Sequence, residues 1–165
     1  MNIYLVGMMG CGKTTLGRAL AKKLGLSFVD LDAALEQRVK KSIPQIFSEQ
    51  GEEGFRQAET ENLKYYAQKK GIVAGCGGGI VLRQENVQLM RGSGKVVFLC
   101  RPPEEILKTL DVSGRPVLRD HPEEFFAVYE KRLPLYEKAA DILFDNSGSV
   151  AEAAEKLAGL LHTKG

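Results

Sequence analysis

Hydrophobic residues recur along this chain with two different spacings, which predict alternating strands and helices. Short apolar runs bounded by glycine or polar residues predict five strands, at residues 2–6, 27–30, 72–74, 96–99 and 141–144. Between them, apolar residues spaced by three or four positions predict helices. We expect these at residues 13–24, 33–69, 83–91, 102–110, 122–138 and 150–161, with the second interrupted near residues 42–44 and at Gly51.

This alternation of strand and helix is typical of βαβ units and predicts an α/β fold. We expect a single domain over residues 1–165, with a parallel sheet of about five strands covered by helices on both faces. Ligands of such sheets bind at the carboxyl ends of the strands. The functional edge should therefore be built from the loops that follow Val6, Asp30, Ala74 and Leu99.

Composition and charge exclude several classes of partner. The 165 residues carry a formal net charge of +2 without an acidic or basic tail, so we expect neither a nucleic-acid partner nor a membrane partner. The apolar start of the chain reaches a glycine loop too early to form the core of a signal peptide. Three widely spaced cysteines indicate reduced thiols, and we expect a cytoplasmic protein. We also expect a monomer.

The segment from Gly7 to Thr14 has the pattern G-x-x-x-x-G-K-[ST] of a phosphate-binding loop, or P-loop. Its glycines let backbone N–H groups point at phosphate oxygens, Lys13 reaches the β- and γ-phosphates, and the Thr14 hydroxyl binds Mg²⁺. A chance match is the alternative, but the segment follows a predicted strand and opens a predicted helix, as the motif requires. We interpret Cys11 as a small filler, although a helix N-terminus can lower a thiol pKa. The residues predicted to bind ATP here are Gly10, Cys11, Gly12, Lys13, Thr14 and Thr15.

Two carboxylates, Asp30 and Asp32, lie two residues apart at the end of the second predicted strand, where period-2 geometry would point both the same way. One could hold Mg²⁺ through water while the other accepts a proton or hydrogen bond from an attacking hydroxyl. The alternative is structural, because Asp32 precedes a helical pattern and could cap that helix. Beside a P-loop we favour the functional interpretation, with Asp30 toward the metal and Asp32 toward the acceptor.

Five further motifs follow the P-loop in a fixed order, and with it they resemble the shikimate kinases, P-loop enzymes similar to the nucleoside-monophosphate kinases. The resemblance runs from residue 2 to about residue 150. It implies a three-layer αβα P-loop fold with a helical substrate-binding insertion at about 31–60 and a mobile lid at about 111–121. The motifs are Asp30-Leu31-Asp32, Gly51-Glu52-x-x-Phe55-Arg56-x-x-Glu59, Gly77-Gly78-Gly79, Arg115-Pro116-x-Leu118 and Arg132-x-Pro134-Leu135-Tyr136, together with Gly17-Arg18 after the P-loop.

The resemblance implies transfer of the γ-phosphoryl group of Mg·ATP to the 3-hydroxyl of shikimate, so the expected small-molecule partners are shikimate and ATP. Arg56 and Arg132 would clamp the shikimate carboxylate, since guanidinium groups bind carboxylates with fixed geometry. Arg56 could also pair with Glu59 on its helix, which is compatible with that clamp. The roles implied are catalysis by Asp32, Lys13 and Arg115, contact with ATP also by Arg115, contact with shikimate by Asp32, Arg56, Gly77, Gly78, Gly79 and Arg132, and Mg²⁺ binding by Thr14 and, through water, Asp30.

Two other functions stay open on the sequence alone. A kinase of this class could act on gluconate or on a nucleoside monophosphate. A non-catalytic nucleotide switch is the second, although the chain lacks the Asn-Lys-x-Asp of guanine recognition. One departure from the family concerns the adenine: residues 145–149 carry no arginine, so contacts there would come from the backbone.

Overall fold

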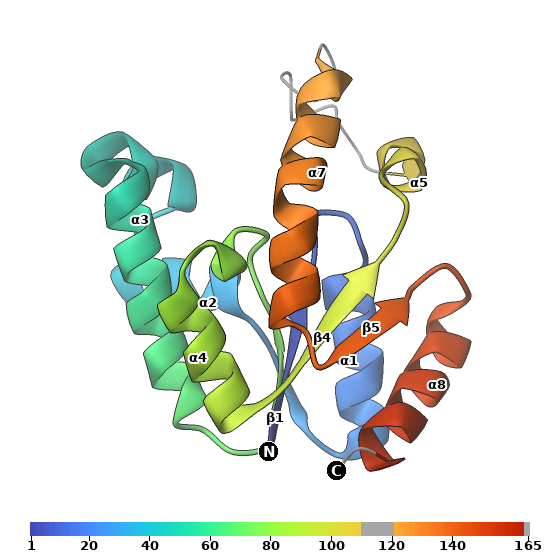
Figure 1. Cartoon of the computed structure of the whole chain (residues 1–165). Helices are drawn as coiled ribbons and strands as arrows, with labels where there is room; N and C mark the ends of the chain where they lie inside the picture. The colour runs from blue at the N-terminus through green and yellow to red at the C-terminus, as the bar shows by residue number, and fades with distance from the viewer. Residues whose placement is uncertain (110–120, 164–165) are drawn as a thin grey trace.

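A central sheet of five parallel strands organises the computed structural model, which describes residues 1–109 and 121–163 (Figure 1). The strand order is β2-β3-β1-β4-β5, so the chain crosses over between strands by way of helices. All the carboxyl ends consequently lie at one edge of the sheet. The strands are β1 (Asn2–Val6), β2 (Ser27–Asp30), β3 (Ile72–Gly75), β4 (Gly94–Cys100) and β5 (Ile142–Asp145).

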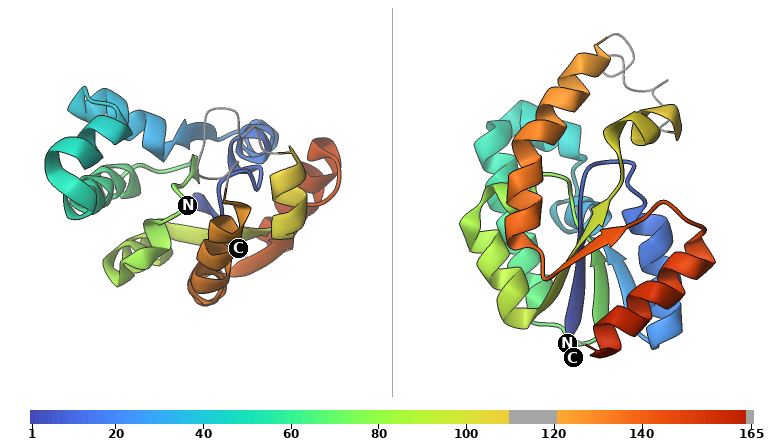
Figure 2. Two further views of the ribbon diagram at one scale, coloured as in Figure 1. Left: turned by 90° about the horizontal axis from the view of Figure 1, so that it is seen from above. Right: turned by 45° about the vertical axis from the view of Figure 1, so that its right-hand side comes forward.

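Helices cover both faces of this sheet and produce three layers. The views in Figure 2 place α1 and α8 together on one face and α3, α4 and α7 on the other, which confirms the predicted α/β architecture. The helices are α1 (Lys13–Leu24), α2 (Leu31–Val39), α3 (Ile43–Ala67), α4 (Gln84–Ser93), α5 (Pro103–Thr109), α7 (Pro122–Ala139) and α8 (Val150–Thr163), and a 3₁₀ turn, η1, spans Ile80–Leu82.

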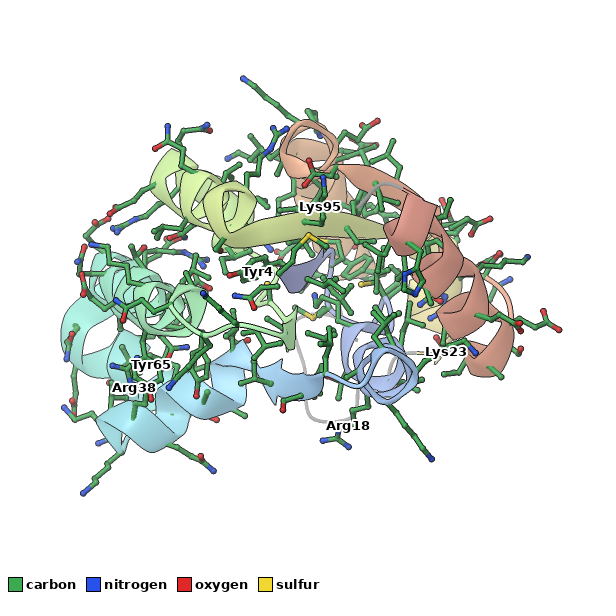
Figure 3. The ribbon with its side chains drawn as sticks, turned by 90° about the horizontal axis from the view of Figure 1, so that it is seen from below. Tyr4, Arg18, Lys23, Arg38, Tyr65 and Lys95 are labelled. Carbon is green, nitrogen blue, oxygen red and sulfur yellow. The ribbon has the colours of Figure 1, made fainter. Side chains whose placement is uncertain are left out.

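The main core lies along β1, where every residue from Asn2 to Val6 is buried. Burial on both faces is what a central parallel strand requires, and it explains why this run is almost wholly apolar. Tyr4 lies near the middle of the molecule when it is viewed from the amino ends of the strands (Figure 3). A second, smaller apolar cluster, made by Leu35, Ile46 and Phe55, holds α2 against α3 and lies outside the sheet.

Several element boundaries differ from those predicted. The helical stretch expected from residue 33 begins two residues earlier, since α2 starts at Leu31 directly after β2. The break expected at Gly51 is a kink within α3, where Gly51 has a φ of +73°. The turn η1 was not predicted, because its apolar run Ile80–Leu82 carries no periodicity. Apart from His121, the loop expected at 111–121 lies outside the described residues. Within the described residues, no helix is long and apolar enough to span a membrane.

Candidate active site

The P-loop joins β1 to α1 and presents its backbone at the carboxyl edge of the sheet. Gly10 and Gly12 have φ values of +81° and +98°, which glycine adopts without the steric cost that a side chain would bring. The first N–H groups of a helix have no intrahelical partners, so those at the start of α1 are available to an anion. The Lys13 ammonium folds over the loop and donates to the carbonyls of Gly7 and, at 3.2 Å, Met8. This is the geometry of a phosphate cradle.

Asp30 and Asp32 line a cavity of about 360 Å³ together with Lys13, Thr14 and the backbone of Gly77 and Gly78. The structure corrects the expected arrangement of these carboxylates, because Asp32 is in the first turn of α2 and not on a strand. The capping role considered for Asp32 belongs to Asp30, whose Oδ1 accepts from the backbone N–H of Asp32 at 3.0 Å and of Ala33 at 3.2 Å. Both carboxylates nevertheless border one space with the P-loop.

The electrostatic environment of Asp32 suits a proton acceptor. Burial raises the pKa of the Asp32 carboxyl, the negative charge of Asp30 raises it further, and the Lys13 ammonium opposes both effects. A carboxylate with a raised pKa has a greater affinity for a proton at neutral pH. Asp32 therefore combines a position beside the phosphate cradle with the basicity that activation of a hydroxyl needs.

Arg56 projects from α3 and is largely buried, with 13% of its side chain exposed. Its Nη1 donates to Glu59 Oε1 at 3.1 Å one turn further along the helix. Burial raises the pKa of the Glu59 carboxyl, and the Arg56 guanidinium works against this shift. Among the described residues, Arg56 Nε and Glu59 Oε2 are buried polar atoms without a hydrogen-bond partner. Since such atoms are costly to leave unpaired, they mark a place where a polar ligand or water can bind.

The glycine triplet after β3 lies against three of these charged groups. A Cβ built on Gly77 would lie 2.8 Å from Oδ1 of Asp32, and one built on Gly79 would lie 2.5 Å from both terminal nitrogens of Arg56. The corresponding position on Gly78 lies 3.3 Å from Nη1 of Arg132. Charged side chains thus approach the backbone of each residue of the triplet, which leaves little space for a side chain there.

Helix α7 brings Arg132 and Tyr136 to the same turn. The Tyr136 hydroxyl donates to the Gly78 carbonyl at 2.5 Å, and its ring stacks on Phe98 of β4 with centroids 5.0 Å apart. Burial raises the pKa of the Tyr136 phenol to about 12, although the neighbouring Arg132 lowers it. The phenol thus stays protonated as a hydrogen-bond donor and fixes α7, with Arg132, against the glycine turn.

A second cavity of about 270 Å³ opens on the other side of the P-loop, bordered by Cys11, Gly12, Arg101 and the loop that follows β5. Asn146 Nδ2 donates to the Cys11 carbonyl at 2.8 Å, and Arg101 Nη1 donates to the Gly10 carbonyl at 3.1 Å. The sequence assigned no role to Arg101, and it assigned Asn146 only to the stretch 145–149, from which backbone contacts with the adenine were expected. The loop after β5 contains no arginine or lysine, but Arg101, which follows β4, supplies a positive charge to this cavity.

Most of the predicted site residues gather at this edge of the sheet. Gly10, Gly12, Lys13, Thr14 and Thr15 line the larger cavity with Asp30, Asp32, Gly77 and Gly78. Cys11 borders the smaller cavity instead, with only 1% of its surface exposed, and burial raises the pKa of its thiol, which agrees with its interpretation as a filler. Arg115 lies outside the described residues.

Comparisons with known proteins agree with one another. A family model described as SKI: Shikimate kinase matches residues 9–161. The shikimate kinase of Clostridium botulinum (strain Alaska E43 / Type E3) is 37% identical over 156 residues, covering 94% of both chains. That of Thermodesulfovibrio yellowstonii is 42% identical over 161 residues, covering 94% of this chain and 92% of the relative. The solved shikimate kinase from Acinetobacter baumannii in complex with shikimate has a TM-score of 0.90 and 38% identity, covering 99% of this chain and 93% of that chain.

Proposed function

This chain belongs to the shikimate kinase family, and on that premise we propose how its own residues phosphorylate shikimate at the expense of ATP. The observation that supports the proposal most directly is the cavity of about 360 Å³, where a phosphate cradle, a basic carboxylate and the glycine turn meet. Two arginines, Arg56 and Arg132, lie against this glycine turn. A phosphoryl donor and a small acidic acceptor would therefore meet in one space.

The phosphate end of the site is built for ATP. The backbone of Gly10 and Gly12 and the ammonium of Lys13 would surround the β- and γ-phosphates, with the start of α1 adding its positive dipole end. The base and ribose would extend toward the cavity of about 270 Å³ beside Asn146 and Arg101. The terminal phosphate, which is the group to be transferred, would then face Asp32.

The oxygen donors next to the cradle suit Mg²⁺, which prefers hydroxyl, carboxylate and water ligands. Thr14 has an exposed side chain on the wall of the larger cavity, and Asp30 borders the same cavity. Because Asp30 Oδ1 caps α2, the second carboxylate oxygen of Asp30 would be the one to accept from a water bound to Mg²⁺. When bound, Mg²⁺ would neutralise charge on the β- and γ-phosphates.

The acceptor end recognises a carboxylic acid with hydroxyl groups. The guanidinium group of Arg56 lies against Gly79 and that of Arg132 against Gly78, and the two would hold the shikimate carboxylate. The Gly78 N–H would donate to a hydroxyl of shikimate. Such fixed contacts restrict the acceptor to one orientation, which turns a bimolecular step into a nearly unimolecular one.

Transfer then requires an in-line attack by the 3-hydroxyl on the γ-phosphorus. Asp32 would orient that hydroxyl and take its proton, and Lys13 would stabilise charge on the phosphate oxygens during transfer. We also assign Arg115, by resemblance, to the phosphates. The segment 31–60 would act as the acceptor-binding part of a single kinase domain, with 111–121 as its lid.

The test is ADP release with ATP, Mg²⁺ and a panel of acceptors that contains shikimate, gluconate and nucleoside monophosphates. Shikimate-dependent release that exceeds release with the other acceptors is expected. ³¹P and ¹H NMR of the product should show that the phosphate is on the 3-hydroxyl. Preference for gluconate, or nucleotide binding without turnover of any acceptor, would contradict the proposal. Asp32→Asn should lose most turnover while staying folded, and near-normal turnover would remove Asp32 from the mechanism.

A further inference from the structure

The inner face of helix α3 carries a polar part beside its apolar Phe55 and Leu63, whereas the inner face of a helix packed on a protein core is ordinarily apolar throughout. Glu59, Thr60 and Asn62 lie on it with 5%, 1% and 3% of their surface exposed. Asn86, at the start of α4, is fully buried beside Thr60. Burying hydroxyl and amide groups costs free energy unless their hydrogen bonds are satisfied, so their partners show what the face does.

The first set of partners leads to the glycine turn. Thr60 Oγ1 donates to Asn86 Oδ1 at 2.8 Å, and Asn86 Nδ2 donates to the Ile80 carbonyl at 3.0 Å. The Ile80 N–H in turn donates to the Gly77 carbonyl at 3.1 Å and closes the turn that contains the triplet. The hydroxyl of Thr60 is therefore linked, through one amide, to the backbone that faces shikimate in the proposed function.

The second set of hydrogen-bond partners leads to the junction of β2 and α2 at residues 30–32, which we call the aspartate turn. Asn62 Nδ2 donates to the Leu31 carbonyl at 3.0 Å, at the residue between the two carboxylates. On its other side Asn62 Oδ1 accepts from Arg38 Nη1 at 3.2 Å, and Arg38 lies over the Tyr65 ring at 4.4 Å from its centroid. Figure 3 shows Arg38 and Tyr65 side by side, where α2 and α3 meet.

We propose that Thr60, Asn62 and Asn86 are positioning residues, which hold α3 in register with both loops that face the acceptor. Arg56 is carried by the same helix, and its guanidinium lies directly against Gly79 of the glycine turn. A shift of the glycine turn relative to the turn that carries Asp30 and Asp32 would separate the carboxylate clamp from Asp32. Two backbone carbonyls, those of Leu31 and Ile80, receive the amides that prevent this shift.

Matched pairs of variants test this inference, which rests on the proposed function. Thr60→Val keeps the shape of the side chain and removes the hydroxyl, whereas Thr60→Ser keeps the hydroxyl and removes the methyl group. Thr60→Val should raise the KM for shikimate about tenfold and leave the KM for ATP unchanged, because misplaced binding groups cost rate steeply. Thr60→Ser should retain the wild-type KM for shikimate. Equal KM values for the two variants would overturn the inference for this link.

The aspartate turn has its own pair. Asn62→Leu removes the anchor to Leu31 and should lower kcat about tenfold, because Asp32 loses its alignment. Arg38→Ala removes the neighbouring guanidinium but leaves the anchor, and it should keep the wild-type kcat. Equal kcat values would overturn the inference for this link.

A measurement without substrate separates this inference from the proposed function. Amide hydrogen exchange of the peptide that covers 76–82 should be faster in Thr60→Val than in Thr60→Ser and the wild-type protein. If the wild-type protein showed no shikimate-dependent turnover, the proposed function would fail while this exchange pattern still tested the anchor. Identical exchange in all three proteins would refute the anchor itself.

Discussion

Replacing Gly79 by alanine tests the fit between the glycine turn and the carboxylate clamp. The added Cβ would lie 2.5 Å from both terminal nitrogens of Arg56, whereas ordinary van der Waals contact begins at 3.4 Å. The backbone of Gly79 has a φ of −99°, so alanine brings no conformational strain and the effect is one of contact alone. Because Arg56 ends in a flexible side chain, the guanidinium can retreat by about 1 Å without unfolding the protein.

That displacement sets the magnitude of the effect. A hydrogen bond to a charged group contributes about 1.5–3 kcal/mol, and a displacement of about 1 Å forfeits most of it. Gly79→Ala should therefore raise the KM for shikimate about tenfold to a hundredfold. The KM for ATP should stay unchanged, because the P-loop is not displaced. Steady-state kinetics with each substrate varied in turn measure both values.

Two controls make the result decisive. Gly92→Ala lies within α4, where no described heavy atom is within 4 Å of the new Cβ, and it should leave both KM values unchanged. In an Arg56→Ala background, Gly79→Ala should add no further increase in the KM for shikimate, because the group that it displaces is gone. A full additional increase in that background, or a wild-type KM for the single variant, would refute the steric argument.

Three further predictions follow from the same geometry. Asp32→Asn should raise Tm at pH 7, because it removes a buried negative charge beside Asp30. Since the folded pKa of Asp32 lies above its ordinary value of 3.8, the gain should vanish below about pH 4, grow as the pH rises toward the folded pKa and stay constant above it, which thermal melts of both proteins across pH 4–8 can check. Arg101→Ala should raise the KM for ATP about threefold to tenfold while the KM for shikimate stays constant, and the reverse pattern would remove Arg101 from the nucleotide site. Iodoacetamide should label the half-buried Cys100 before Cys11, which is 1% exposed, and peptide mass spectrometry that finds Cys11 labelled first would contradict its role as a filler.

The fold was predictable from the sequence where local signals and tertiary packing agree. Strand β1 and helix α1 have their predicted bounds, because an apolar run is followed by glycines that only a tight loop accommodates and Gly25 then ends the helix in a left-handed conformation. The link between β2 and α2 was not predictable in this way. Asp30 serves as strand end and helix cap at once, so no loop residue marks the boundary, and the capping role was considered for Asp32 instead.

Some residues of the candidate site were also predictable from the sequence, and others were not. Residues within contiguous motifs, such as Lys13 and the glycine triplet, were recognisable because their neighbours in sequence are also their neighbours in the site. Arg101 and Asn146 were not, since each contacts the P-loop from a different strand end. Their approach to it depends on the strand order, with β4 beside β1 and β5 beside β4, and no spacing along the chain encodes that order.

The polar inner face of α3 shows why such positions escape pattern analysis. A helix that reads as polar at Glu59, Thr60 and Asn62 is expected to turn that face to water. Glu59 pairs with Arg56 on its own helix, which the spacing along the chain allowed for. Thr60 and Asn62 are buried because their partners lie on other elements, the amide of Asn86 and the backbone carbonyl of Leu31, which a sequence pattern does not reveal. Apolar residues could fill the same volume without needing hydrogen-bond partners, but they would not fix the direction in which two loops point. On this argument the buried amides fix the geometry of the proposed acceptor site, and the Thr60→Val and Thr60→Ser pair measures whether the KM for shikimate depends on them.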